Sequence, residues 1–179
     1  MSSVEVPERI TAALSGLDAR ARDAADSIPT FELERGRVRK ALEQLKHAAG
    51  FEQSTLVTVV DHHPREPRFE VVWQFRSYAH GDRVRLTCAV PGSDAWAPSC
   101  CDLWPGASFS EREAWDMFGV RFEGHPDLRR LLMPEGYEHH PLRKDFPHQG
   151  IEPDRLYRQW DRERRERWLA EQAQEEGGA

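Results

Sequence analysis

Two stretches with a strict two-residue alternation constrain the fold of this chain more than any other feature. In residues 69–75 and again in 84–90, every second side chain is apolar. Successive side chains of a strand point to opposite faces, so each stretch predicts a strand with one buried face. A third, β-branched run covers residues 56–60, and residues 62–67 and 77–82 have the composition of turns. Together these runs predict an antiparallel meander of at least three strands.

Helical patterns lie on both sides of the meander. Apolar residues recur at helical spacing in the first thirty residues, where we expect one amphipathic helix that ends before Pro29. A clearer apolar stripe runs through residues 38–49 and is followed by Gly50. A third helix is expected between Pro105 and Gly119. The pattern predicts an α+β fold, with helices packed on one face of a mostly antiparallel sheet.

The remainder of the chain has the composition of an extended, turn-rich C-terminal tail. Prolines at 134, 141 and 147 prevent a long element, and residues 155–176, rich in Arg and Glu, predict a charged terminal helix. We therefore divide the chain into an N-terminal helical extension (1–30), an α+β lobe (31–122) and a C-terminal docking tail (123–179). The tail has few core residues, so we expect it to be mobile and protease-sensitive until a partner covers its apolar side chains, Leu131, Leu132, Leu142 and Phe146.

Composition excludes several classes of protein. The chain has 25 Lys and Arg against 31 Asp and Glu, which gives a net charge of −6 and disfavours a nucleic-acid binder. No apolar stretch approaches the ~20 residues of a membrane span, and the N-terminus has no signal-peptide pattern. The three cysteines cannot form a disulfide framework. We expect a soluble cytoplasmic protein.

Motifs for metal binding and catalysis are missing from the sequence. The eight histidines include no HExxH pattern, there is no Cys-x-x-Cys, and adjacent histidines of an extended chain point apart. Phosphate-binding glycine loops and a nucleophile elbow are also missing. We therefore expect no catalytic, cofactor or metal site in this chain. An alternative of a different class, a stand-alone metal-dependent hydrolase, would use the histidines and carboxylates between Glu111 and His148.

The most informative segment begins with a dense cluster of charges. Glu113 and Asp116 are spaced to share one helical face, and Arg112 neighbours Asp116 at i,i+4. Charges beside bulky aromatic residues are costly to bury unless each is paired. Two interpretations remain open: a solvated charged face, or a charge-latched segment that presents a docking surface to another protein. The cations available for pairing lie downstream, at Arg121, Arg129, Arg130, Arg143 and Lys144.

This segment also carries a resemblance. The run Glu111-Arg112-Glu113 is followed at fixed spacing by Asp116, Met117-Phe118, His125, Arg129 and Leu131-Leu132. These motifs, with the runs at 102–105, 118–130 and 141–147, resemble the C-subunit family of respiratory complex I. That family includes the C subunit of NADH:quinone oxidoreductase and related subunits of energy-converting hydrogenases. Phe109 stands where the family usually has tryptophan, and the first thirty residues match no pattern of the family.

The resemblance implies a non-catalytic structural subunit in the hydrophilic arm of proton-translocating NADH:quinone oxidoreductase. Its partners would be the large quinone-site subunit, known as the D subunit, and neighbouring iron–sulfur subunits, with no nucleic acid. Flavin and iron–sulfur clusters would belong to those partners and none to this chain. The chain would be peripheral, on the cytoplasmic side of the cell membrane, and would meet the membrane only through the complex.

The same resemblance leaves an alternative open, the equivalent subunit of a membrane-bound energy-converting hydrogenase or of a ferredoxin- or F420-dependent relative. The residues expected at the subunit interface share a place in the matching motifs: Glu111, Arg112, Glu113, Asp116, Phe118, His125, Arg129, Leu131, Leu132, Arg143, Lys144 and Asp145.

Overall fold

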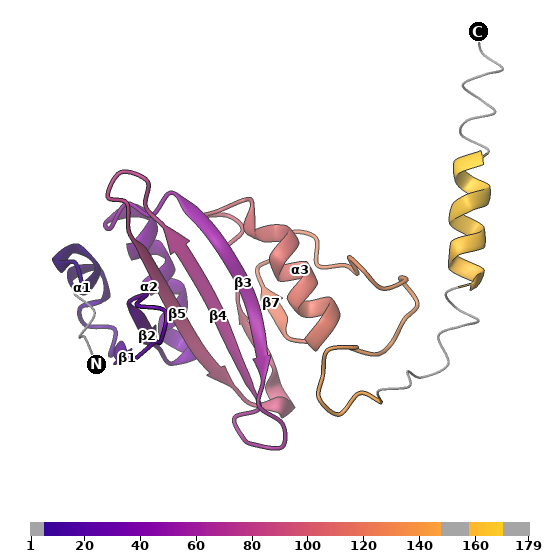
Figure 1. Ribbon diagram of the computed structural model, residues 1–179, viewed down its shortest axis with the longest axis horizontal. Helices are drawn as coiled ribbons and strands as arrows, with labels where there is room; N and C mark the ends of the chain where they lie inside the picture. Colours follow the sequence, from indigo (N-terminus) through magenta and orange to yellow (C-terminus); the bar gives the residue numbers. More distant parts are fainter. Residues whose placement is uncertain (1–5, 148–157, 170–179) are drawn as a thin grey trace, which may run out of the picture.

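A five-stranded sheet forms the centre of the molecule (Figure 1). The structure, a computed structural model, describes residues 6–147 and 158–169. Strands β3 (Gln53–Asp61), β4 (Phe69–Arg76) and β5 (Arg83–Val90) pair antiparallel in chain order. The predicted meander is therefore confirmed, including its two turns.

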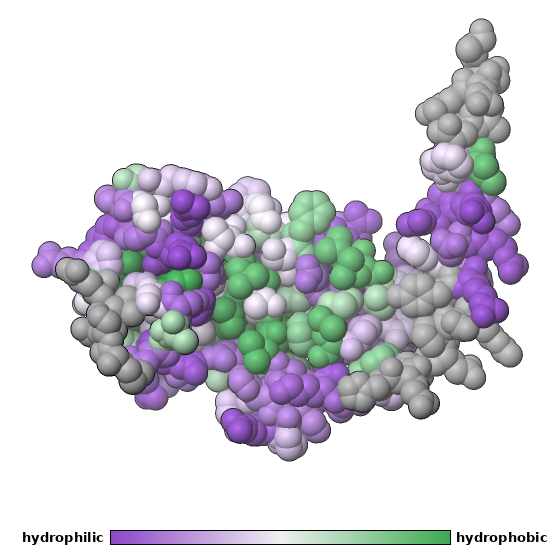
Figure 2. All heavy atoms as spheres, viewed as in Figure 1, coloured by the Kyte–Doolittle hydropathy of each residue, from purple (hydrophilic) through white to green (hydrophobic). Residues whose placement is uncertain are grey.

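The alternation in the sequence places the core on one side of this sheet. The inward side chains of β4 and β5, from Phe69 to Phe75 and from Val84 to Val90, are at most 1% exposed. On the opposite side, Leu56 and Val60 of β3 remain 41% and 40% exposed. Figure 2 shows apolar residues gathered over the middle of the molecule and bordered by hydrophilic ones. The helices cover the inward face, which confirms the predicted α+β arrangement.

Helices α2 (Arg35–His47) and α3 (Ala107–Phe118) supply most of that cover. The predicted stripe of α2 is buried, and Gly50 follows the helix with a φ of 68°. Gly119 ends α3 in the left-handed conformation, with φ 77°, and its amide donates to the Trp115 carbonyl oxygen. A residue with a β-carbon is strained in this conformation, so the glycine fixes the end of α3.

The N-terminal prediction is wrong in its extent. Helix α1 covers only Glu8–Leu14, and strands β1 (Arg20–Arg22) and β2 (Thr30–Glu32) follow it. Gly16 and Asp18, with φ values of 73° and 52°, break the helical path. Strand β2 then pairs parallel with β5, so the sheet is mixed, and the apolar face of α1 joins the common core. The division of the chain at residues 30 and 122 stays a prediction.

A second, small sheet forms outside the predicted meander. Strand β6 (Trp96–Pro98) pairs parallel with β7 (Arg121–Glu123), after a short 3-10 turn, η1 (Gly92–Asp94). The pairing brings residues 99–101 beside α3. The predicted charged helix is present over residues 158–169, and the rest of its range lies outside the described residues. No helix in the described ranges is long and apolar enough to cross a membrane.

Candidate functional site

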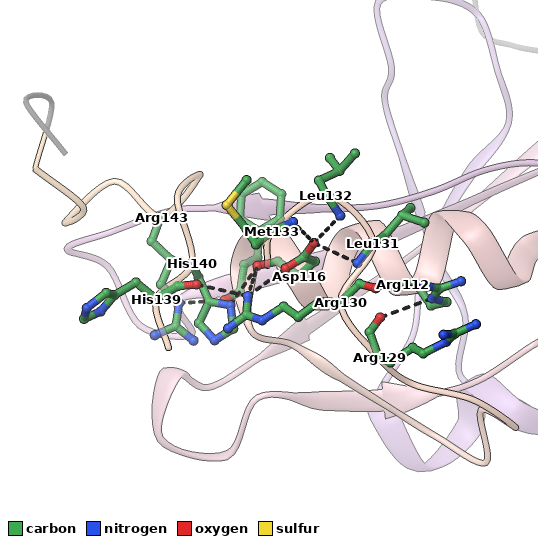
Figure 3. A network of polar contacts seen from close by, with 11 residues as sticks. Arg112, Asp116, Arg129, Arg130, Leu131, Leu132, Met133, His139, His140 and Arg143 are labelled. Atoms are coloured by element: carbon green, nitrogen blue, oxygen red, sulfur yellow. Dashed lines mark hydrogen bonds and ion pairs between the residues drawn. The ribbon is translucent and has the colours of Figure 1, made fainter. Parts of the chain in front are cut away.

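The segment that carries the family resemblance begins at Glu111 and is organised around Asp116, which is fully buried on α3. One carboxylate oxygen, Oδ2, accepts from the backbone amides of Leu131, Leu132 and Met133, at 3.0, 2.7 and 2.9 Å. The other, Oδ1, accepts from Arg130 Nη1 at 2.7 Å. Figure 3 shows these donors converging on the carboxylate. We call Asp116, Arg130 and the three amides the Asp116 clamp.

Its hydrogen-bond partners keep the Asp116 carboxyl ionised. Burial opposes the charge on Asp116, but Arg130 and the three amides outweigh it and keep the pKa of this carboxyl below its usual range. The carbonyl oxygen of Asp116 also accepts from Arg130 Nη1, at 2.9 Å, and from His140 Nδ1, at 2.9 Å. Burial lowers the pKa of His140, so its ring is neutral at physiological pH. One helical residue therefore fixes both ends of the segment 130–140.

Arg112 holds the same segment from a neighbouring position. Its Nε and Nη2 atoms donate to the carbonyl oxygens of Arg129 and Arg130, at 3.1 and 2.8 Å. Arg112 and Asp116 are neighbours at i,i+4, as the spacing indicates, but both side chains bind the tail rather than each other. Glu113 is exposed and does not share the buried position of Asp116.

A second buried aspartate, Asp61, anchors the later part of the tail. Its oxygens accept from Arg68 Nε and Nη2 at 3.0 and 2.9 Å, and from the amide of Lys144 at 2.9 Å. Arg68 also donates twice to Asp145, at 2.9 and 2.7 Å. Burial opposes the charge on Asp61, but Arg68 and the amides lower its pKa far below the usual range. We call this group the Asp61 anchor.

Sequence reasoning missed Asp61 and Arg68, although a signal was present. Val57, Val59 and Asp61 share the inward parity of β3, so the carboxylate falls where the strand pattern buries a side chain. A buried carboxylate requires partners, and this one obtains them from Arg68, just before β4, and from the tail.

The tail from Leu131 to Pro147 thus contacts the lobe at several points, and its expected mobility and protease sensitivity in the free chain stay a prediction. Tyr137 is 4% exposed, and the Leu142 amide donates to the Met117 carbonyl oxygen at 3.1 Å. Two buried aspartates compensate for the few apolar contacts of the tail. Its outward side chains include Leu132 and Leu142, 52% and 54% exposed.

Glu111 forms a separate buried cluster at the other end of α3. Its carboxylate accepts from Ser99 Oγ at 2.6 Å, from the Cys100 amide at 2.7 Å and from Cys101 Sγ at 3.2 Å. Burial raises the pKa of the Cys101 thiol to about 12, so the thiol stays protonated and serves as a donor. Glu111 therefore secures the loop that precedes α3.

His125 lies next to this cluster, and sequence reasoning missed the juxtaposition. One donor atom each from Cys101, Glu111 and His125 lies within 4.8 Å of the others, a set that could hold a metal ion. However, His125 Nδ1 accepts from the Asp127 amide at 3.0 Å, so the ring proton sits on Nε2, which faces Ser108 Oγ at 3.1 Å. Metal ligation through Nε2 would move that proton to Nδ1 and break the bond from Asp127, which disfavours a metal here.

The remaining interface residues of the prediction are dispersed. Arg129 is exposed and pairs with Asp127, at 2.8 Å. Phe118 and Leu131 are half-buried, and the side chain of Lys144 is exposed. Arg143 donates from Nε to the Phe118 carbonyl oxygen, at 2.6 Å. All the predicted residues therefore lie on α3 or in the tail, but only some of them contact one another.

Comparison with known proteins identifies the family. Residues 31–152 match the family described as respiratory-chain NADH dehydrogenase, 30 Kd subunit. The chain belongs to this family. The C 2 subunit of the NADH-quinone oxidoreductase of Rhizobium meliloti is 39% identical over 150 residues, 82% of each chain. The C subunit of the same enzyme from Roseiflexus castenholzii is 53% identical over 88 residues, 49% of this chain and 51% of that protein, so some alignments span only half of the relative.

Solved structures of related proteins share the fold of this 30 Kd subunit family member. A trypsin-resistant fragment of Nqo5, residues 1–134, aligns with a TM-score of 0.61 and 32% identity, and covers 68% of this chain and 98% of that one. A chain of the membrane-bound sulfane sulfur reductase, an archaeal respiratory membrane complex, aligns with a TM-score of 0.67 and 25% identity. That alignment covers 79% of this chain and 85% of that one.

The two buried aspartates predict how acid acts on this 30 Kd family member. Carboxyls whose pKa is lowered by folding stabilise the fold above their unfolded value, near 4, and that stabilisation is lost as the pH falls through their folded pKa. The free energy of unfolding is therefore expected to decline steeply below about pH 4. Urea unfolding between pH 2 and 7 measures this slope, which Asp116→Asn is expected to reduce. An unchanged slope in the variant would contradict the assignment.

Proposed function

We propose that this chain is a non-catalytic structural subunit in the hydrophilic arm of a proton-translocating NADH:quinone oxidoreductase, where it docks on the large quinone-site subunit, the D subunit. The observation that carries the proposal is the way in which the Asp116 clamp and the Asp61 anchor hold the tail against the lobe. The Asp116 clamp and the Asp61 anchor use polar side chains inside this chain, and leave Leu132 and Leu142 exposed. In this arrangement the charged side chains bind groups of the same chain, and the exposed apolar side chains remain available to a partner.

The surface that we assign to docking consists of Phe109, Leu132 and Leu142, which are 64%, 52% and 54% exposed. All three lie on α3 or against it, because Leu132 and Leu142 donate their amides to Asp116 Oδ2 and to the Met117 carbonyl oxygen. We call these three residues the docking surface. Exposed apolar side chains held on a fixed frame are typical of protein–protein interfaces.

A fused relative supports the identity of the partner. The C/D 2 subunit of the NADH-quinone oxidoreductase of Aquifex aeolicus is 44% identical over 121 residues, which are 68% of this chain and 20% of that protein. Its name joins the C and D subunits in one polypeptide. By this proposal the chain holds no cofactor, flavin and iron–sulfur clusters belong to neighbouring subunits, and the assembly lies peripherally on the cytoplasmic side of the membrane.

One observation favours a second candidate function. The similarity to a chain of the membrane-bound sulfane sulfur reductase extends over 79% of this chain. The same lobe and tail could therefore serve as the equivalent subunit of another membrane-bound energy-converting complex. The large subunit that co-purifies with this chain distinguishes the two candidates.

Co-purification with the large subunit tests the proposal. The chain carrying Leu132→Ser and Leu142→Ser is expected to capture at least tenfold less large subunit than the wild type, since burying a leucine contributes roughly 1.5–3 kcal/mol. The matched control carries Leu56→Ser and Val60→Thr on the open face of the sheet, and is expected to retain capture. Equal capture by the wild type and the tail variant would refute the docking surface.

A further inference from the structure

Arg143 differs from the other arginines that hold the tail. Arg112, Arg130 and Arg68 each donate two or more hydrogen bonds to acceptors within the chain. Arg143 donates from Nε, to the Phe118 carbonyl oxygen at the end of α3. Among the residues that the structure describes, no acceptor meets either of its Nη groups, although the residue is half-buried.

The guanidinium of Arg143 is nevertheless held in place. It lies over the Phe69 ring, 5.5 Å from the centroid, and beside the C-terminal carbonyls of α3, where a cation is favoured. A β-carbon at Gly119 would lie only 2.2 Å from Nη2, so the backbone approaches the group closely. Figure 3 shows Arg143 beside His140, at the opposite end of the network from Arg112. The two Nη groups of Arg143 are therefore held in place, but no acceptor of the described residues binds them.

Arg143 also lines a small pocket, of about 220 Å³. Phe146 and Pro147 supply apolar wall, and Glu138 and Asp145 supply carboxylates. Arg68 already binds Asp145, and within the described part of the chain Glu138 makes no ion pair with Arg143. The pocket therefore offers room for one further side chain next to two free Nη groups.

The charge of Arg143 itself is compensated only in part. Burial and the nearby Arg68 cation lower the pKa of Arg143, because the carboxylates of Asp61 and Asp145 compensate its charge only in part. His140 also lines the pocket, and its ring is neutral at physiological pH. A guanidinium binds a carboxylate with two parallel hydrogen bonds, which would use two of the four N–H donors that remain on the Nη groups.

We propose that Arg143 is the receptor for a carboxylate side chain, an Asp or Glu, of the large subunit. The inference rests on the proposed function and adds the chemistry of the contact: the carboxylate enters the pocket between Arg143 and Phe146 and accepts from the Nη groups. Arg112 and Arg130 act inside this chain, whereas Arg143 acts across the interface.

Zero-length cross-linking in the co-purified complex tests this assignment. In Arg143→Lys, a carbodiimide activates a carboxylate, the introduced amine displaces the resulting leaving group as a urea, and an amide forms only between groups in contact. Mass spectrometry is expected to find residue 143 joined to one Asp or Glu of the large subunit. Arg121→Lys, at an exposed arginine of β7, is the control and is expected to give no such product.

A binding measurement completes the test. Arg143→Gln is expected to weaken binding of the large subunit at least tenfold while the free chain keeps its melting temperature, and Arg121→Gln is expected to bind as the wild type does. Unchanged affinity of Arg143→Gln, or a cross-link only to Glu138 or Asp145 of the same chain, would overturn the inference and leave the proposed function standing. Failure of the wild-type chain to bind the large subunit would refute both.

Discussion

Replacing Asp116 with alanine is expected to lower the free energy of unfolding by roughly 3–5 kcal/mol. The change leaves Arg130, whose side chain is 8% exposed, without its carboxylate, and three backbone amides without their acceptor. Buried donors that lose an acceptor keep their full desolvation penalty. Urea unfolding at neutral pH measures the loss, and hydrogen exchange at residues 131–133 reports whether the tail is released.

Glu113→Ala provides the control for this prediction. Glu113 lies one turn earlier on the same helix and is exposed, so its removal is expected to change the stability by less than about 0.5 kcal/mol. A similar small effect of both substitutions would show that the Asp116 clamp contributes little.

Arg68→Ala is expected to have an effect of similar size, about 3 kcal/mol. The side chain of Asp61 is 1% exposed, and without Arg68 it keeps its charge in a buried position beside a second carboxylate, Asp145. Arg68 also binds Asp145, the residue after Lys144. Its removal therefore releases this part of the tail, and the bond from the Lys144 amide to Asp61 is expected to weaken. Hydrogen exchange at that amide should become much faster, together with a lower urea midpoint.

The matched control is Arg65→Ala, in the turn that precedes β4. Arg65 is exposed, and its backbone amide, which the substitution keeps, donates to the His62 carbonyl oxygen. The variant is expected to unfold as the wild type does. If the Lys144 amide exchanged at the same rate in Arg68→Ala as in the wild type, the tail would be held by other contacts.

The sheet could be predicted because its information is local. The inward residues of β4 and β5 alternate without exception, and each strand pairs with the next one in the chain. The N-terminal strands escaped prediction for the opposite reason. Strands β1 and β2 have three residues each, and β2 pairs with β5, more than fifty residues away. No periodicity is readable in so short a segment, and a left-handed break at Gly16 has no unique sequence signature.

The candidate site was located by its motif, but its contacts could not be predicted. Helical spacing placed Arg112 beside Asp116, whereas the acceptors of Arg112 are main-chain carbonyls of the tail. The partner of Asp116, Arg130, was one of five downstream cations available for pairing, but nothing in the sequence selected it from the five. Side chains that fold a loop onto a helix meet groups that only the path of the loop defines. Spacing rules for one helix do not include such partners.

The use of main-chain amides by Asp116 has a consequence for how this surface can evolve. Oδ2 contacts N–H groups that every residue except proline possesses, so the side chains of residues 131–133 do not take part in these three bonds. The three hydrogen bonds therefore survive a change of side chain at these positions, and the loop keeps its course. Substitution of the exposed Leu132 can therefore alter the surface without moving the loop, and only proline would remove one of the three donors.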